Sequence, residues 1–353
     1  MDLTQIATRL LRYRGKEQGR ERVPVRFAAS QSLVDHGVMR LQRKEWGFPL
    51  AVGLLVSVAS VGAWAGIVDN VRVQVGQNNY SAAEAALRDY RVRHGVTPEY
   101  LEALSWMARG AAELKQWNQA TGYARETRGL SEQLLAKQKL DSEPHLPIAL
   151  GAAYEVLAEG MASKGETAQA IAMLRAALAR YSNTSIGPRL QKNLNLLALV
   201  GRPAPPLQAT QYLGPKPPTL ASLKGSPVLL FFWAHWCGDC KAEVPIIARL
   251  RQEFAPAGLV VIGPTQLYGY AARGEDATPA QEQAYIESVR QRYYASLIDM
   301  PVPLSQQNFR TYGASTTPTL VVLDRAGKVA MYHPRAMPYE ELRAAVERAT
   351  SSH

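Results

Sequence analysis

The feature that most constrains the fold is a cysteine pair between an apolar run and a helical pattern. Residues 226–234, SPVLLFFWA, form a strand-like apolar run of the kind buried on both faces of a sheet. The motif WCGDC follows, and KAEVPIIARLRQEF then has helical periodicity. Cys237 and Cys240 are the only two cysteines in 353 residues. We therefore expect a strand, a thiol pair and a helix to meet at one point of the fold.

This placement suits redox chemistry. A sulfur at a strand-to-helix junction lies near the helix N-terminus, where free N–H groups and the helix dipole favour the thiolate. Cys237 is then the nucleophile, and Cys240, one turn later, can resolve a mixed disulfide. Half of a zinc site and a structural disulfide without turnover are the alternatives. Zinc needs two more ligands, and although His235 is near, the other histidines have no ligand-like pairing.

The rest of the C-terminal region gives the order of elements. GLVVIG predicts a second buried strand, and PTLVVLD and KVAMYH predict a hairpin across the turn at residues 324–327. PYEELRAAVERAT predicts a closing amphipathic helix. Strand, helix, strand, hairpin and helix is the order of the α/β thioredoxin fold. We expect that fold over residues 223–353, with an inserted segment at residues 264–299.

Two motifs carry a more specific resemblance. VLLFFWAHWCGDCKAEVP and TYGASTTPT, residues 228–245 and 311–319, resemble the extracytoplasmic thioredoxin-like reductases of the TlpA/ResA type. The resemblance implies that Glu243 is a buried carboxylate that tunes the cysteines and relays a proton to or from Cys240. It also implies that Pro318 is cis and faces the cysteines, with Thr317 offering backbone groups to an extended substrate strand. Trp236 is expected to contact substrate as well.

The sequence also departs from that family. Gly238 and Asp239 stand between the cysteines, where Pro-containing pairs are common. The charge of Asp239 is expected to disfavour the thiolate and make the couple more reducing, whereas a protonated His235 has the opposite effect. Phe231 occupies the place of a buried Asp in cytosolic thioredoxins, which gives Glu243 more importance. The pattern of the cytochrome-maturation branch is not reproduced, which weakens an apocytochrome substrate.

The inserted segment is rich in tyrosine. Its aromatic rings suit either core packing or a substrate-facing surface, and both interpretations remain open. The tyrosines are Tyr268, Tyr270, Tyr285, Tyr293 and Tyr294.

The first part of the chain predicts export. Residues 48–68 are 21 consecutive uncharged, mostly apolar positions, enough for a helix to span a bilayer. Residues 1–47 hold ten Lys/Arg and five Asp/Glu, so this basic arm is expected on the cytoplasmic side. Alternatively, Met39 is the true start, residues 1–38 are misannotated upstream sequence, and 63–65 form the cleavage site of a signal peptide. A buried helix of a soluble domain is the remaining interpretation.

Residues 71–200 predict an all-α domain. Apolar residues at helical spacing recur in YEVLAEGMASKGETAQAIAMLRAALARY, in LSWMARGAAELKQWNQATGYARE and more weakly in NYSAAEAALRDY. This resembles the tetratricopeptide repeat (TPR), which implies stacked helix pairs and a surface for a peptide or protein partner. A helical spacer without a partner is the alternative. The proline-rich residues 201–222 are interpreted as a linker into the next domain.

These patterns favour an extracytoplasmic thiol–disulfide oxidoreductase that works mainly as a protein-disulfide reductase. It is expected to use a membrane thiol-transferring donor, and to need no cofactor or metal beyond the cysteine pair. No basic helix with interleaved aromatic residues occurs in the body of the chain, which argues against nucleic-acid binding. A disulfide oxidase or isomerase, and a scaffold protein with a non-catalytic cysteine domain, are the alternatives.

Overall fold

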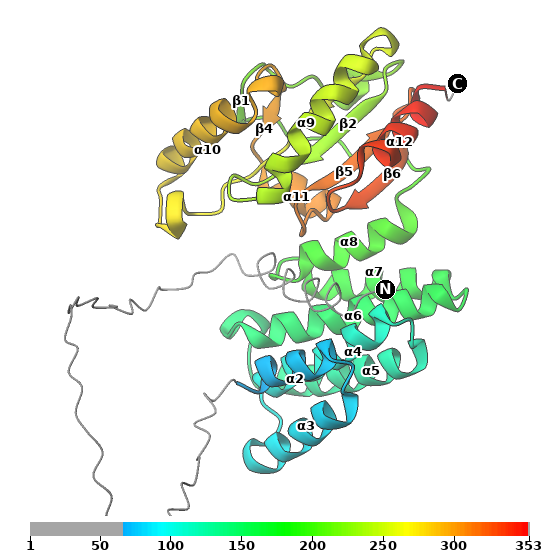
Figure 1. The fold of residues 1–353 in the computed structure, drawn as a ribbon, viewed down its shortest axis with the longest axis vertical. Helices are drawn as coiled ribbons and strands as arrows, with labels where there is room; N and C mark the ends of the chain where they lie inside the picture. Colours follow the sequence, from blue (N-terminus) through cyan, green and yellow to red (C-terminus); the bar gives the residue numbers. More distant parts are fainter. Residues whose placement is uncertain (1–65, 352–353) are drawn as a thin grey trace, which may run out of the picture.

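The computed structural model describes residues 66–351, which form a helical domain and an α/β domain (Figure 1). The expected arm at 1–47, the alternative start at Met39 and the expected membrane segment up to residue 65 lie outside the described residues. Helix α2 (Ile67–Gly76) begins within the last residues of that segment, and Ile67 is buried in the helical domain. The helical domain therefore starts a few residues earlier than expected. Within residues 66–351, no helix combines the length and apolarity required for a membrane span.

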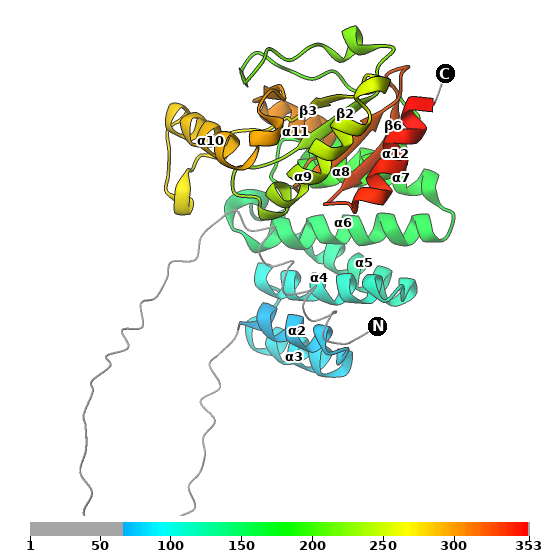
Figure 2. The same ribbon diagram turned by 45° about the horizontal axis from the view of Figure 1, so that its top comes forward.

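The helical domain consists of consecutive helices that pack in pairs (Figures 1 and 2). The first helix of each pair packs on the first helix of the next pair, α2 on α4 and α4 on α6. The second helix of each pair also contacts the first helix of the pair that follows. The all-α prediction for this region is confirmed. After α2, the helices are α3 (Tyr80–His94), α4 (Pro98–Glu113), α5 (Trp117–Leu134), α6 (His145–Ser163), α7 (Thr167–Tyr181) and α8 (Gly187–Ala198).

Two glycines occupy matching places in successive pairs. A Cβ on Gly110 of α4 would lie 2.2 Å from Val75 and 2.8 Å from the hydroxyl of Tyr80. A Cβ on Gly160 of α6 would lie 2.3 Å from Thr121, in the first turns of α5. Each glycine therefore lets one helix approach the preceding pair closely.

The α/β domain has a four-stranded sheet in the order β3-β2-β5-β6. Strand β2 (Val228–Phe232) is central, parallel to β3 (Val260–Ile262) and antiparallel to β5 (Thr319–Leu323). Strand β6 (Val329–Pro334) is antiparallel to β5, and the connecting turn is closed by the Gly327 N–H donating to the Asp324 carbonyl. The strands and hairpin predicted from the sequence are confirmed.

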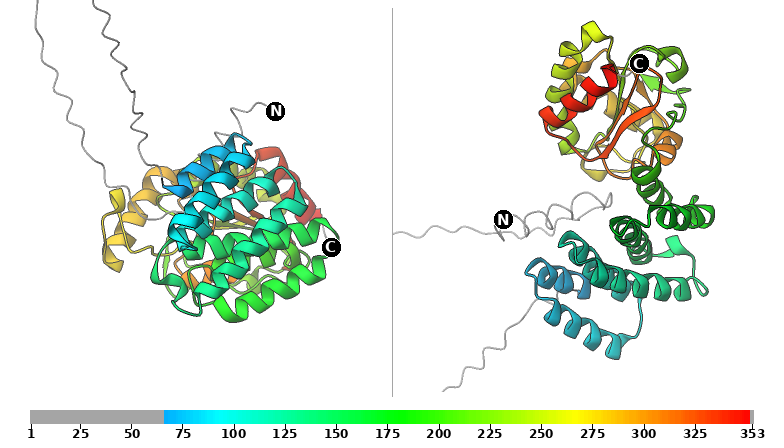
Figure 3. Two further views of the ribbon diagram at one scale, coloured as in Figure 1. Left: turned by 90° about the horizontal axis from the view of Figure 1, so that it is seen from below. Right: turned by 90° about the vertical axis from the view of Figure 1, so that its right-hand side faces the viewer.

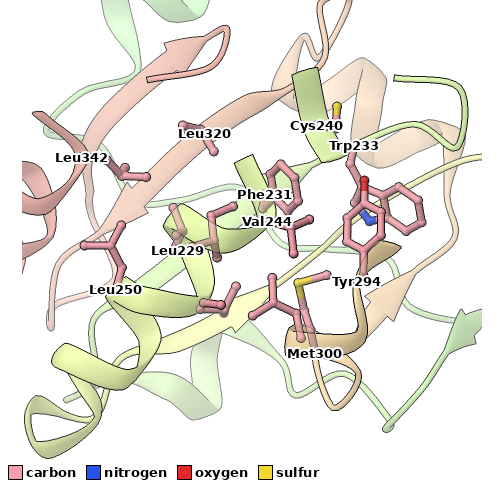
Figure 4. Packing of buried hydrophobic residues seen from close by; sticks show 14 of the residues in the cluster. Leu229, Phe231, Trp233, Cys240, Val244, Leu250, Tyr294, Met300, Leu320 and Leu342 are labelled. Carbon is pink, nitrogen blue, oxygen red and sulfur yellow. The ribbon is translucent and has the colours of Figure 1, made fainter. Parts of the chain in front are cut away.

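Both faces of this sheet are covered, which explains why β2 and β5 are buried at every position. Phe231 and Leu320 face a cluster formed with α9 (Gly238–Glu253), α10 (Pro279–Tyr293) and α12 (Tyr339–Ser351). Leu230 and Val321 face the other side, where α11 (Gln306–Tyr312) packs. The first cluster is shown in Figure 4.

Residues 201–222 differ from a simple linker because their backbone is bonded into the α/β domain. Strand β1 (Tyr212–Leu213) pairs with β4 (Val302–Pro303), and the Gly201 N–H donates to the Val329 carbonyl at the start of β6. The prolines prevent a helix here, but they do not leave the segment unattached.

Helix α8 joins the two domains (Figures 1 and 3). It packs against α11 and β6, and the Asn195 side chain donates to the Thr311 carbonyl at 3.5 Å. Gly313, just after α11, has φ 59° and lies so close to α8 that a Cβ would be 2.3 Å from the backbone nitrogen of Lys192. The helical domain therefore touches the loop that leads into Thr317 and Pro318.

Candidate active site

The two cysteines lie at the start of α9, where they form a disulfide with Cα atoms 5.3 Å apart. Cys237 is the N-cap of this helix, and the Cys240 N–H points at its Sγ at 3.0 Å. The side chains are buried, with Cys237 3% and Cys240 0% exposed. Cys237 Sγ thus lies at a helix N-terminus and accepts from one of its N–H groups, as the strand-to-helix junction predicted.

A rigid base holds this junction. Trp233, directly after β2, is fully buried and donates from Nε1 to the Gly263 carbonyl at 2.9 Å. Its ring packs on Tyr294, with ring centroids 4.4 Å apart, and Phe231 contacts the same tyrosine (Figure 4). The Trp233 carbonyl accepts from the Thr265 hydroxyl at 2.8 Å. The loop that carries the cysteines therefore starts from a fixed point.

The second motif lies beside the first. The Thr317–Pro318 peptide bond is cis, as expected. Phe232 at the end of β2 pairs with Thr319 at the start of β5, so Pro318 adjoins the strand end from which the cysteine loop departs. Thr317 is 7% exposed, and its hydroxyl makes no hydrogen bond within the described part of the chain.

Glu243 lies on α9, one turn after Cys240, and is 2% exposed. Glu243 is therefore a buried carboxyl group, as the resemblance implied, and not a surface glutamate. Its Oε1 accepts from the Met337 N–H at 3.3 Å, in the loop before α12. Burial raises the pKa of Glu243 to about 7, although the Met337 bond lowers it in part. The carboxyl group can therefore gain or lose a proton near neutral pH.

His235 has a partner that the sequence did not reveal. Its Nε2 lies 3.2 Å from Oε1 of Glu282 on α10, and both side chains are 1% exposed. The two residues are 47 positions apart, and no spacing pattern connects them. Trp236 is half-buried and packs edge-on against Tyr268.

The residues between the cysteines are more accessible. Gly238 is exposed, and a Cβ added there would meet nothing within 4 Å. Asp239 lies in the first turn of α9 and is half-buried. A proline-containing pair is therefore not excluded by space at position 238.

The tyrosines of the inserted segment differ in burial and in what they contact. Tyr294 is fully buried in the core, whereas Tyr293 is 42% exposed. Tyr268, Tyr270 and Tyr285 place their rings edge-on around His235, at centroid distances of 5.3–5.6 Å. Three of these five rings therefore pack against His235, two residues before Cys237.

The C-terminal part of the chain is similar to several known proteins. Residues 200–332 match the AhpC/TSA family. The thioredoxin-like protein YneN of Bacillus subtilis (strain 168) is 28% identical over 145 residues, which are 40% of this chain and 75% of YneN. The thiol-disulfide oxidoreductase ResA of Bacillus thuringiensis (strain Al Hakam) is 28% identical over 37% of this chain and 66% of its own length.

A shorter sequence match and a solved structure are also named as thiol:disulfide interchange proteins. The thiol:disulfide interchange protein DsbE of Pseudomonas fluorescens biotype C is 34% identical over 65 residues, 18% of this chain and 34% of DsbE. A crystal structure of a thiol:disulfide interchange protein from Chlorobium tepidum TLS is 22% identical, covering 42% of this chain and 97% of that one, with a TM-score of 0.33.

Proposed function

We infer that this chain, whose residues 200–332 match the AhpC/TSA family, is a thiol–disulfide oxidoreductase that reduces protein disulfides at Cys237 and Cys240. One observation carries the proposal: Cys237 caps α9 while bonded to Cys240. A helix N-cap favours the thiolate, and a neighbouring thiol one turn later allows a closed two-step cycle.

The proposed catalytic cycle transfers electrons between thiols and disulfides alone, so it requires no cofactor. In the reduced protein, the Cys237 thiolate attacks one sulfur of the substrate disulfide, forming a mixed disulfide and releasing the other substrate sulfur as a thiolate. Cys240 then loses its proton and attacks Cys237 Sγ, which releases the second substrate thiolate. Two electrons and the one proton of Cys240 leave the cysteine pair, the released substrate thiolates are protonated in equilibrium with water, and the enzyme ends as the disulfide seen here. A dithiol donor must reduce that disulfide for the next turnover.

Glu243 is proposed to handle the proton of Cys240. The two residues are three positions apart on α9, so they lie on the same side of the helix. With a pKa near 7, Glu243 can accept the Cys240 proton during resolution and return it when the donor reduces the disulfide.

Substrate is proposed to approach as an extended segment beside Thr317 and Pro318. Thr317 precedes strand β5, and its unpaired hydroxyl lies next to the cis bond. Backbone groups at a strand end can pair with an extended peptide in the manner of strand addition. Trp236, between His235 and Cys237, would contact the substrate segment from the other side of the disulfide.

The reducing direction is proposed over oxidase or isomerase activity. Asp239 lies within one turn of both sulfurs, and its charge disfavours the thiolate. Burial lowers the pKa of His235, so the imidazolium that would oppose this effect is disfavoured at neutral pH. A less stable thiolate makes the dithiol a better electron donor.

Turnover of insulin disulfides by the full-length protein, with dithiothreitol as donor, tests this function. The wild type should reduce insulin, Cys237→Ser should be inactive, and Cys240→Ser should accumulate a mixed disulfide. If wild type and Cys237→Ser reduce insulin at the same background rate, the site is not catalytic and the scaffold alternative is favoured.

We further propose that the protein works outside the cytoplasm, with residues 48–68 as anchor or signal, and that the helical pairs dock a partner in the manner of TPR domains. The matched glycines Gly110 and Gly160 support a repeated unit. Val92 on α3 is 86% exposed and suits a contact surface. Val92→Asp should fail to complement a deletion strain while it reduces insulin normally; full complementation would reject docking at this surface.

A C-terminal alkaline phosphatase fusion tests the location, because that enzyme is active only after export.

A further inference from the structure

The inserted segment contains a buried carboxyl group, that of Glu282, which contacts His235 in the loop before Cys237. Glu282 lies in the first turn of α10 and is fully buried. Besides His235, it accepts hydrogen bonds from two backbone N–H groups, those of Tyr268 at 2.6 Å and Gly269 at 2.8 Å. Two backbone N–H groups directed at one carboxyl group suit its ionised form, and they fix its orientation.

His235 is enclosed on every side that the structure describes. The rings of Tyr268, Tyr270 and Tyr285 surround it, and its Nδ1 is buried without a hydrogen-bond partner in residues 66–351. Since a carboxylate only accepts, Nε2 carries the proton that is shared with Glu282. Nδ1 then keeps a free lone pair.

The charge of this pair follows from its surroundings. Burial lowers the pKa of His235, the Glu282 carboxylate opposes that effect, and the Lys241 ammonium on α9 adds to the lowering. Burial raises the pKa of Tyr268 and of Tyr270, so these two rings carry no charge at neutral pH. The imidazole is therefore neutral, and the His235–Glu282 pair holds one negative charge.

The histidine of this pair lies in the loop that carries the reacting sulfur. His235 is two residues before Cys237, so their Cα atoms are at most about 7 Å apart. Because the pair is buried, water screens its field poorly. A negative charge here disfavours the Cys237 thiolate and hence the reduced form of the couple.

We propose that Glu282, acting through His235, is a positioning residue that keeps the cysteine couple reducing, and that a proton taken up by the pair makes the couple more oxidising. This inference rests on the proposed function, because it concerns the same disulfide exchange. It gives the inserted segment at residues 264–299 a role in setting the redox equilibrium.

The test compares equilibrium constants of full-length proteins in dithiothreitol redox buffers, with reduced protein measured by thiol alkylation. Glu282→Gln removes the charge and should shift the equilibrium toward reduced protein by about tenfold, equivalent to about 30 mV. Glu282→Asp keeps the charge and should stay near the wild type. Glu275→Gln makes the same change at an exposed position of the inserted segment and should have no effect. A folded Glu282→Gln variant with the wild-type constant overturns the proposal, even if its melting temperature falls.

A second variant covers the case in which Glu282→Gln does not fold. His235→Asn removes the titrating ring, so as the pH falls below neutrality the wild-type equilibrium should move toward reduced protein relative to this variant. Identical pH profiles from pH 5 to 8 would also overturn the proposal. Failure of the proposed function itself is separate, because it would appear as wild-type protein that does not exchange with dithiothreitol or insulin.

Discussion

The carboxylate of Glu243 accepts a hydrogen bond from the backbone N–H of Met337, 94 residues further along the chain. This bond links the helix that carries the cysteines to the loop between β6 and α12. Within residues 66–351 it is the only hydrogen bond to this carboxyl group, whose residue is 2% exposed, so the charged form is poorly compensated. The consequences for proton transfer and for stability can be measured separately.

Stability should fall with rising pH because of Glu243. Its pKa is about 7 in the folded protein and lies at the ordinary value of 4.5 when unfolded. The folded state therefore binds more protons between these values, and folding loses on the order of 2 kcal/mol as the pH rises through them. Urea unfolding of the oxidised protein should show this loss in the wild type and not in Glu243→Gln. Glu275→Gln serves as the control, and parallel profiles for wild type and Glu243→Gln would disprove the assignment.

Glu155 on α6 should contribute stability with the opposite pH dependence. It is 8% exposed and accepts from Arg189 and Lys192 of α8. Burial alone would raise its pKa, but these two cations hold it well below the ordinary range. Its contribution is therefore present above the unfolded pKa and is lost as the pH falls through the folded value.

Glu155→Gln should cost about 3 kcal/mol at pH 7, because two buried cations lose their partner. The cost should shrink toward pH 3. Glu126→Gln, which breaks an exposed pair with Arg91, should cost less than about 1 kcal/mol. An equal, small effect of both substitutions in urea unfolding would refute the buried cluster.

Gly313→Ala should loosen the contact between α8 and the loop leading to Pro318. The added Cβ meets both a left-handed φ and the backbone of Lys192, so a loss of about 2–4 kcal/mol is expected. Gly327→Ala is the matched control, since it has φ 76° and nothing within 4 Å, and should cost about 1 kcal/mol. Limited proteolysis should also cleave Gly313→Ala faster between the domains. Equal losses of unfolding free energy for the two substitutions would mean that α8 moves away from residue 313 with no loss of stability.

The sequence was informative where local pattern determines structure. The apolar run, Cys237 and the following helical periodicity placed the thiols at a strand-to-helix junction, and the resemblance placed Pro318 in cis. The pairing of His235 with Glu282, 47 residues away, has no local signature, because it depends on how the inserted segment folds back. The contact of Lys192 with Gly313 depends likewise on the placement of one domain on the other. Proline content indicated a linker at residues 201–222, but composition does not report the β1–β4 pairing that attaches this segment.

The reduction potential of the full-length wild-type protein at pH 7 shows whether its dithiol can donate electrons to protein disulfides. Equilibration with thiol–disulfide buffers, followed by alkylation of the free cysteines, gives this value. We expect a potential of about −250 mV or lower, in the range of reducing thioredoxin-like proteins. A value near about −120 mV, that of a strong oxidant, would contradict it.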